Sequence, residues 1–156
     1  RAAELYAMTQ GDTSTRVAYS EVAIARIKAY RGDLDGARSV VDMINEKQAR
    51  IRAESADAQA LPMDGQILLD NVMLWCRGAP DVEFDALLER ARAVPLQAPD
   101  IIELMEFKAL NAVRLGRRED GLRLLEAALA DAEKNAQVVT DRLRRQIERV
   151  AARAAS

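Results

Sequence analysis

Histidine is absent from this 156-residue chain, and cysteine occurs once, at Cys76. The missing imidazole excludes Ser-His-Asp and Cys-His catalysis, histidine-liganded zinc and a histidine pH switch. A single cysteine excludes an internal disulfide and a thiolate metal cluster, which favours a reducing compartment. Cys76 ends the apolar run LLDNVMLWC, so we expect a buried structural thiol there rather than a reactive one.

Aromatic residues, glycine and proline are scarce as well. Aromatics make up 4% of the chain, with 7 Gly and 4 Pro, while alanine is abundant. This composition is typical of closely packed helices. Lys and Arg total 23 against 25 Asp and Glu, and the resulting net charge of −2 argues against nucleic-acid binding by this domain.

Long apolar runs are missing too. The longest strongly apolar stretch, Ile67 to Cys76, is interrupted by Asp70 and Asn71 and is too short to cross a bilayer, so we expect no membrane insertion. The sequence opens with Arg1 rather than Met, and we therefore expect a fragment or a processed form of a longer protein. No targeting segment is recognisable, which favours a cytoplasmic location.

Apolar residues recur at three- and four-residue intervals along nearly the whole chain, which predicts an all-α fold. In the first stretch this stripe includes Val17, Val22, Ala25, Ile27 and Ala29. No stretch alternates with a period of two, so strands are not expected. We expect Asp81 and Asp100 to cap two of the helices. The expected helices cover 2–8, 15–31, 34–52, 65–77, 81–94, 101–115, 119–135 and 136–152.

Glycines stand at corresponding points of these helical pairs. GDLDGA at 32–37 and GRREDG at 116–121 both fall where one helix ends and its partner begins, and Gly78 marks another helix end. Gly32 and Gly116 are separated by two units of about 42 residues, which indicates an internal repeat. A helical hairpin cannot bury both of its sides alone, so stacked neighbours would complete the core.

The spacing of small residues around these glycines resembles the tetratricopeptide-repeat (TPR) family. That family places a small residue seven positions before the glycine and another five positions after it. Ala25 and Ala37 supply them in the first pair, Ala109 in the third, and Leu125 with Ala128 match a later large–small pair. Four features depart from the family pattern. Glu21 and Met105 replace an early aromatic, Gly121 replaces an alanine, the middle pair aligns only with an inserted turn, and the units are longer than usual.

The resemblance implies a single domain over residues 1–156, built as a short right-handed TPR-like α-solenoid of antiparallel hairpins. Its units would span about 15–53, 65–94 and 100–135, with a terminal capping helix at 136–153. An unrelated helical bundle is the alternative. The resemblance also implies that first-helix residues face partners across a concave surface: Tyr19, Arg26, Tyr30, Phe107, Leu110 and Arg114. Alternatively, Tyr19, Tyr30 and Phe107 pack between units, and Trp75 is either a core residue or an anchor in the groove.

Two charged segments complete the pattern. An acidic block is interpreted as a solvated face rather than a catalytic or metal-binding carboxylate cluster; it comprises Asp81, Glu83, Asp85, Glu89, Asp100, Glu103 and Glu106. The last helix carries Leu143, Ile147, Val150 and Ala154 as an apolar seam, which suits a solvated cap or a short coiled-coil contact between copies. Five arginines surround that seam: Arg142, Arg144, Arg145, Arg149 and Arg153.

The missing nucleophile–base pairs and the absence of a glycine-rich phosphate loop argue against an enzyme and against a bound cofactor or metal. We therefore expect a scaffold or adaptor domain that binds a segment of another protein. The alternative is a regulatory or sensor module of a larger bacterial signalling or transcription protein, binding a peptide or small molecule. Fold class alone does not separate the two functions.

Overall fold

The computed structural model describes residues 15–54 and 61–153. Within these residues the chain is all-α, with seven α-helices, one 3-10 turn and no strand. The elements are α2 (Thr15–Tyr30), α3 (Leu34–Glu54), α4 (Met63–Arg77), α5 (Asp81–Arg92), α6 (Ala98–Arg114), α7 (Arg118–Asn135), η1 (Gln137–Val139) and α8 (Thr140–Ala152). The helix expected at 2–8 lies outside the described residues.

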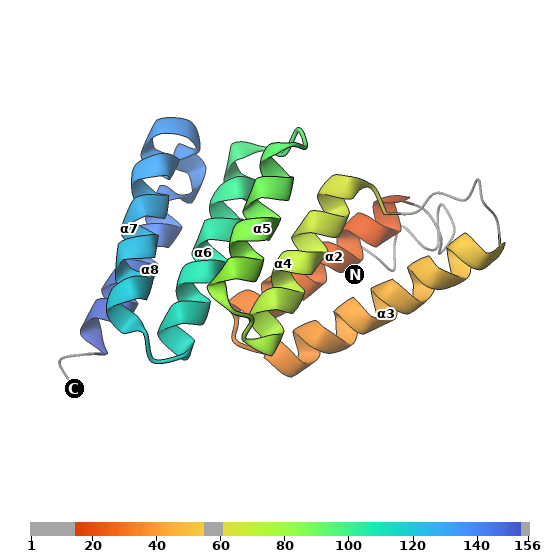
Figure 1. Ribbon diagram of the computed structural model, residues 1–156, viewed down its shortest axis with the longest axis horizontal. Coiled ribbons are helices and arrows are strands. Elements are labelled where there is room, and N and C mark those ends of the chain that lie inside the picture. The colour runs from red at the N-terminus through yellow and green to blue at the C-terminus, as the bar shows by residue number, and fades with distance from the viewer. Residues whose placement is uncertain (1–14, 55–60, 154–156) are drawn as a thin grey trace. The chain divides into compact units, whose positions relative to one another are not determined.

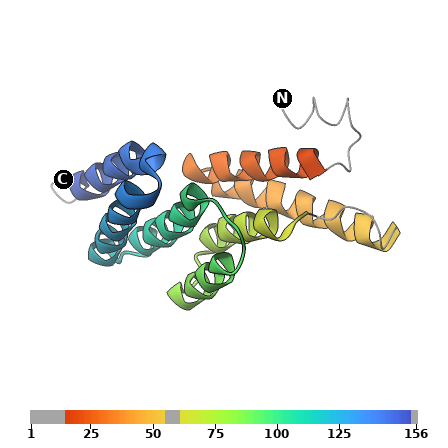
Figure 2. The same ribbon diagram turned by 90° about the horizontal axis from the view of Figure 1, so that it is seen from above.

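The chain divides into two compact units, Arg1–Cys76 and Arg77–Ser156. In the first unit α2 and α3 form an antiparallel hairpin (Figures 1 and 2). Its core contains small and β-branched residues from both helices, including Ala25, Ala29, Ala37 and Val41. Small side chains allow the two helices to pack closely, as their spacing predicts.

A buried ion pair joins the same two helices. Lys47 Nζ on α3 lies 2.9 Å from Glu21 Oε1 on α2, and both side chains are at most one-tenth exposed. Glu21 is the residue that stands where the TPR pattern has an aromatic. Here the position is filled by an ion pair instead of a ring, and breaking such a pair would leave an uncompensated buried charge.

Helix α4 is tied to the hairpin by polar contacts. The Leu61 backbone N–H donates to Gln48 Oε1 over 2.6 Å, just before α4 begins. At the other end of α4, Arg38 Nη2 donates to the Cys76 carbonyl over 3.2 Å. Cys76 itself is buried, as its place in an apolar run predicts.

Glycines end the helices as the sequence predicts. Gly32 (φ 78°) and Gly116 (φ 83°) both adopt the left-handed conformation that glycine favours. The Gly32 N–H bonds to the Ala29 carbonyl and the Asp33 N–H to the Lys28 carbonyl, both over 3.0 Å. The same pair of bonds follows Gly116, so one Schellman closure is repeated in the two units.

Asp33 then begins α3. Its Oδ1 accepts the Gly36 N–H over 2.9 Å, which is the bond that an N-cap side chain makes. Its Oδ2 lies 2.9 Å from Lys28 Nζ in the last turn of α2. The hydrogen bond from Lys28, followed by that from Gly36, lowers the pKa of the Asp33 carboxyl below its ordinary value.

The second unit holds α5, α6, α7, η1 and α8 (Figure 1). Helices α6 and α7 form a hairpin, and α7 also packs against α8. Leu143 and Val150 from α8 are buried in the same core cluster as Leu125 and Ala128 from α7, with Ile147 partly buried against it. The apolar seam expected on the last helix therefore lies inside this unit; Ala154 lies outside the described residues.

Several expected helix starts are wrong. α4 begins at Met63 and α6 begins at Ala98. Pro99 fits the first turn of α6 and allows that helix to begin before Asp100. Asp81 and Asp100 are first-turn residues of α5 and α6 rather than caps, and Pro80 and Gln97 occupy the cap positions without side-chain cap bonds. The last helix is also not continuous from 136, because η1 precedes α8.

The charged segments are less solvated than expected. Glu103 and Glu106 of the acidic block are buried, at 2% and 0% exposure. Arg142 is not part of a solvated face either, because its Nη2 lies 2.7 Å from Glu106 Oε2 and its Nε donates to the same oxygen over 3.0 Å. This contact links α8 to α6 through a carboxylate that water does not reach.

Candidate functional site

Three of the predicted partner-binding residues lie on one face of α2. Tyr19, Arg26 and Tyr30 are spaced by seven and four residues, so their side chains follow a single stripe along the helix. All three are partly exposed. Such a stripe offers apolar ring surface, hydroxyl groups and a cation to a partner.

Tyr19 is held by a hydrogen bond to another helix. Its hydroxyl donates to Asp64 Oδ1 over 2.6 Å, across to the first turn of α4. Desolvation of the hydroxyl, aided by this hydrogen bond and by the Asp64 charge, raises the pKa of Tyr19 to about 12. Tyr19 therefore stays protonated at neutral pH and positions α4 as well as contributing ring surface.

Ile27 extends this surface and was missed by the sequence reasoning. The periodicity assigned Ile27 to the buried stripe of the first helix, but half of the residue is exposed. The signal that could have identified it is its helical angle, which falls between the Tyr19–Tyr30 stripe and solvent rather than beside Val22 and Ala25. We call Tyr19, Arg26, Ile27 and Tyr30 the α2 face.

The candidate residues on α6 are in a different environment. Phe107 is fully buried, so its ring has no surface to offer a partner, and Leu110 is partly buried. Arg114 is exposed, but its Nη2 donates to Asn111 Oδ1 over 3.1 Å. Asn111 in turn donates to the Ala79 carbonyl over 2.8 Å, so Arg114 belongs to a polar network ahead of α5.

Trp75, the other candidate anchor, is 7% exposed and lies in the core rather than on a surface. The large side chain therefore stabilises α4, as its placement in the run LLDNVMLWC allows. Among the six predicted partner-binding residues, three thus share one face of α2, while Phe107 is removed from the surface and Arg114 is engaged in the second unit.

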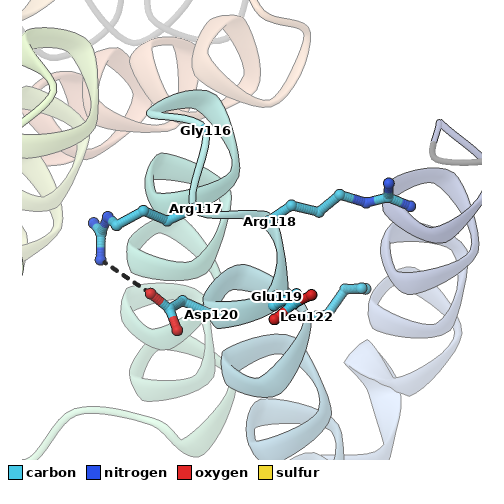
Figure 3. A pocket seen from close by; sticks show the side chains of 6 residues that line it. All are labelled: Gly116, Arg117, Arg118, Glu119, Asp120 and Leu122. Carbon is cyan, nitrogen blue, oxygen red and sulfur yellow. Dashed lines mark ion pairs between the residues drawn. The ribbon is translucent and has the colours of Figure 1, made fainter.

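The turn between α6 and α7 forms an open hollow of about 570 Å³, lined by Gly116, Arg117, Arg118, Glu119, Asp120 and Leu122. Figure 3 shows the Arg117 and Arg118 side chains pointing to opposite sides of this turn. Arg117 makes two 2.7 Å bonds to the Asp81 carboxylate, which lower the pKa of Asp81. Arg118 donates to the Ala151 carbonyl at the end of α8.

Both cations of that hollow are therefore occupied by contacts within the second unit, and Glu119 and Asp120 add negative charge beside them. An anionic ligand would have to compete with the bidentate Arg117–Asp81 pair. The Arg117–Asp81 pair beside the hollow links the start of α7 to the start of α5. The hollow does not bring together a nucleophile, a base and a group that could stabilise a developing charge.

Within residues 15–54 and 61–153, no three His, Cys, Asp or Glu side chains come together in a way that could hold a metal ion. None of the helices in the same part of the chain is both long enough and apolar enough to cross a membrane. In comparisons with known proteins, no family model matches the chain, and no curated protein or solved structure matches it either.

Proposed function

We propose that this chain is a non-enzymatic protein–protein interaction domain, an adaptor or scaffold of the bacterial cytoplasm built from TPR-like hairpins. The observation that carries the proposal is the α2 face, where two tyrosines, an arginine and a half-exposed isoleucine lie together. Tyrosine and arginine are the residue types that most often dominate binding energy at protein interfaces.

The chemistry of the α2 face indicates which kind of partner segment would complement it. Arg26 carries a positive charge and lies between Tyr19 and Tyr30 along α2, and Ile27 supplies exposed apolar area. An extended or helical segment with an acidic residue next to an apolar one complements this surface. The charge pair would set the encounter rate and register, while the rings and the isoleucine would provide the buried area.

The test is quantitative capture of cellular partners by the intact chain and by Arg26→Glu with Tyr30→Ala. We expect the specifically retained proteins to fall at least about tenfold, which corresponds to about 1.4 kcal/mol of binding free energy. Arg52→Glu is the matched control, because Arg52 is an exposed arginine on α3 of the same unit. Circular dichroism checks that both variants stay folded.

If the folded α2 variant retains the same partners as the parent chain, the α2 face is not the binding surface. If Arg52→Glu loses them equally, the effect is one of net charge. The regulatory alternative predicts instead that a small molecule raises the melting temperature. It has less support, because the hollow at the α6–α7 turn is open and its arginines are already engaged.

A further inference from the structure

The outer face of α8 carries cations that the second unit does not use. Arg145, Arg149 and Arg153 follow one another at four-residue intervals and are all exposed. None of the three makes an ion pair or side-chain hydrogen bond within the described residues, whereas Arg142 and Arg144 pair with Glu106 and Glu133. We call these three residues the basic α8 face; two carboxylates lie beside them, Glu148 and, one turn before Arg145, Asp141, which contacts Arg144.

The first unit has an acidic counterpart on α3. Asp35, Asp42 and Glu46 are exposed along one side of the helix and form no ion pair in the part of the chain described. They line an open hollow of about 420 Å³ together with Arg38, Ser39 and Met43. Arg38 donates a hydrogen bond to the Cys76 carbonyl, and Met43 adds exposed apolar area to the hollow. We call Asp35, Asp42 and Glu46 the acidic α3 face.

The two faces match in spacing as well as in sign. Asp42 and Glu46 are one helical turn apart, and so are Arg145 and Arg149. Side chains four residues apart on a helix lie about 5–6 Å from each other, so two helices laid side by side can form both pairs at once. Arginine suits this contact because its planar guanidinium binds carboxylates through two parallel hydrogen bonds.

We propose that the basic α8 face of one copy docks on the acidic α3 face of a second copy of this chain. Because the two faces differ, the contact is heterologous, and each copy keeps one free face for a further copy. The association is then weak, salt-sensitive and open-ended. It uses neither the α2 face nor any residue assigned to partner binding, so it stands independently of the proposed function.

Two other occupants of the basic α8 face are disfavoured by the same observations. A lipid surface would have to receive the apolar side of α8, but Leu143 and Val150 are buried in the core of the second unit. A nucleic acid would meet three arginines beside Asp141 and Glu148 on a chain whose net charge is −2. The acidic α3 face of a second copy has the opposite charge and the same four-residue spacing as the basic α8 face.

The experiment is sedimentation velocity with two charge-reversed variants, Arg145→Glu with Arg149→Glu and Asp42→Arg with Glu46→Arg. The parent chain is expected to grow in mean mass with concentration at about 0.01 M salt, where screening acts over about 30 Å, and to be monomeric at about 1 M. Each variant alone presents two faces of like charge and stays monomeric. An equimolar mixture of the two variants associates again, because every face then has an opposite partner.

A control with the same charge change as Arg145→Glu with Arg149→Glu is Arg52→Glu with Lys134→Glu. It alters one exposed cation in each unit and is expected to associate like the parent. If a reversal unfolds the chain by circular dichroism, Arg145→Gln with Arg149→Gln and Asp42→Asn with Glu46→Gln replace it, each losing self-association. A parent chain that is monomeric at low salt at every concentration overturns the proposal. So does association that persists in either variant alone, or a mixture that fails to associate.

Discussion

Two buried asparagines show how much the surroundings of a single side chain decide. Asn71 on α4 and Asn111 on α6 are both fully buried. Asn111 donates to the Ala79 carbonyl and accepts from Arg114, whereas neither polar atom of the Asn71 amide has a hydrogen-bond partner among residues 15–54 and 61–153. A buried polar group without a partner destabilises a fold by about 1–3 kcal/mol, while a satisfied one stabilises it modestly.

Asn71→Leu should therefore raise the free energy of unfolding by about 1–3 kcal/mol, since leucine has the same branched arrangement of heavy atoms and no polar atom to desolvate. Asn111→Leu is the matched control and should lower it by a similar amount, because it leaves the Ala79 carbonyl without its donor. Urea denaturation with an unchanged m value measures both changes. Equal destabilisation by the two substitutions would contradict this account.

At the scale of helices, the crossing of α6 and α7 is set by Gly121. A Cβ atom at this position would lie 2.3 Å from Val113 Cγ2 and 2.9 Å from the Ala109 carbonyl oxygen, which belongs to the backbone. The corresponding position in the first hairpin, five residues after Gly32, is the fully buried Ala37. The departure from the TPR pattern at Gly121 thus has a physical reason: these two helices approach too closely for alanine.

Gly121→Ala should lower stability by about 1–3 kcal/mol through overpacking, more than the roughly 1 kcal/mol gained from helix propensity. Val113→Ala should cost less in the Gly121→Ala background than in the parent chain, because it removes the nearest clash. A double-mutant cycle in denaturant measures this coupling. Additive effects of the two substitutions would show that the helices separate without strain.

The start of α3 depends on one ionised carboxylate. Because the folded-state pKa of Asp33 lies below its ordinary value of 3.8, its contribution to stability is present above that pH. The contribution falls away as the pH drops through the lowered value. Asp33→Asn should therefore be less stable than the parent near pH 7, and the two should converge as the solution is acidified below about pH 4.

Thermal unfolding of both proteins between about pH 3 and 7 tests this expectation. The chain has no histidine, so no imidazole titrates in the upper half of that range. A difference between the two proteins that stays constant down to the lowest pH would mean that the charge of Asp33 does not contribute, and that its hydrogen bond to Gly36 acts alone.

For the whole molecule, local signals predicted the helices well. Gly32, Gly78 and Gly116 marked helix ends because each takes a positive φ that other residues avoid. The expected caps at Asp81 and Asp100 are wrong, because Pro80 occupies the cap position of α5 and Pro99 allows α6 to begin at Ala98. Asp81 then became available to Arg117, which is 36 residues away in the sequence.

The candidate site was only partly predictable, because contacts between residues far apart in the sequence decide which side chains are buried. The helical spacing placed Tyr19, Arg26 and Tyr30 on one face, but burial of Phe107 depends on packing that the pattern of one helix does not contain. The bonds Tyr19–Asp64 and Arg142–Glu106 join residues 45 and 36 positions apart. Charge patterning along a helix cannot tell an exposed arginine from one that reaches a buried carboxylate.

The Arg142–Glu106 pair has a consequence for how the second unit opens. If α8 lifts away, the fully buried Glu106 carboxylate loses its counter-charge at the same moment as Leu143 and Val150 leave the core. Because these losses occur together, a partly detached α8 has no lower free energy than a fully detached one. In native-state hydrogen exchange the amides of 143–150 should therefore exchange as one cooperative unit with a shared opening free energy, rather than fraying residue by residue from the C-terminal end.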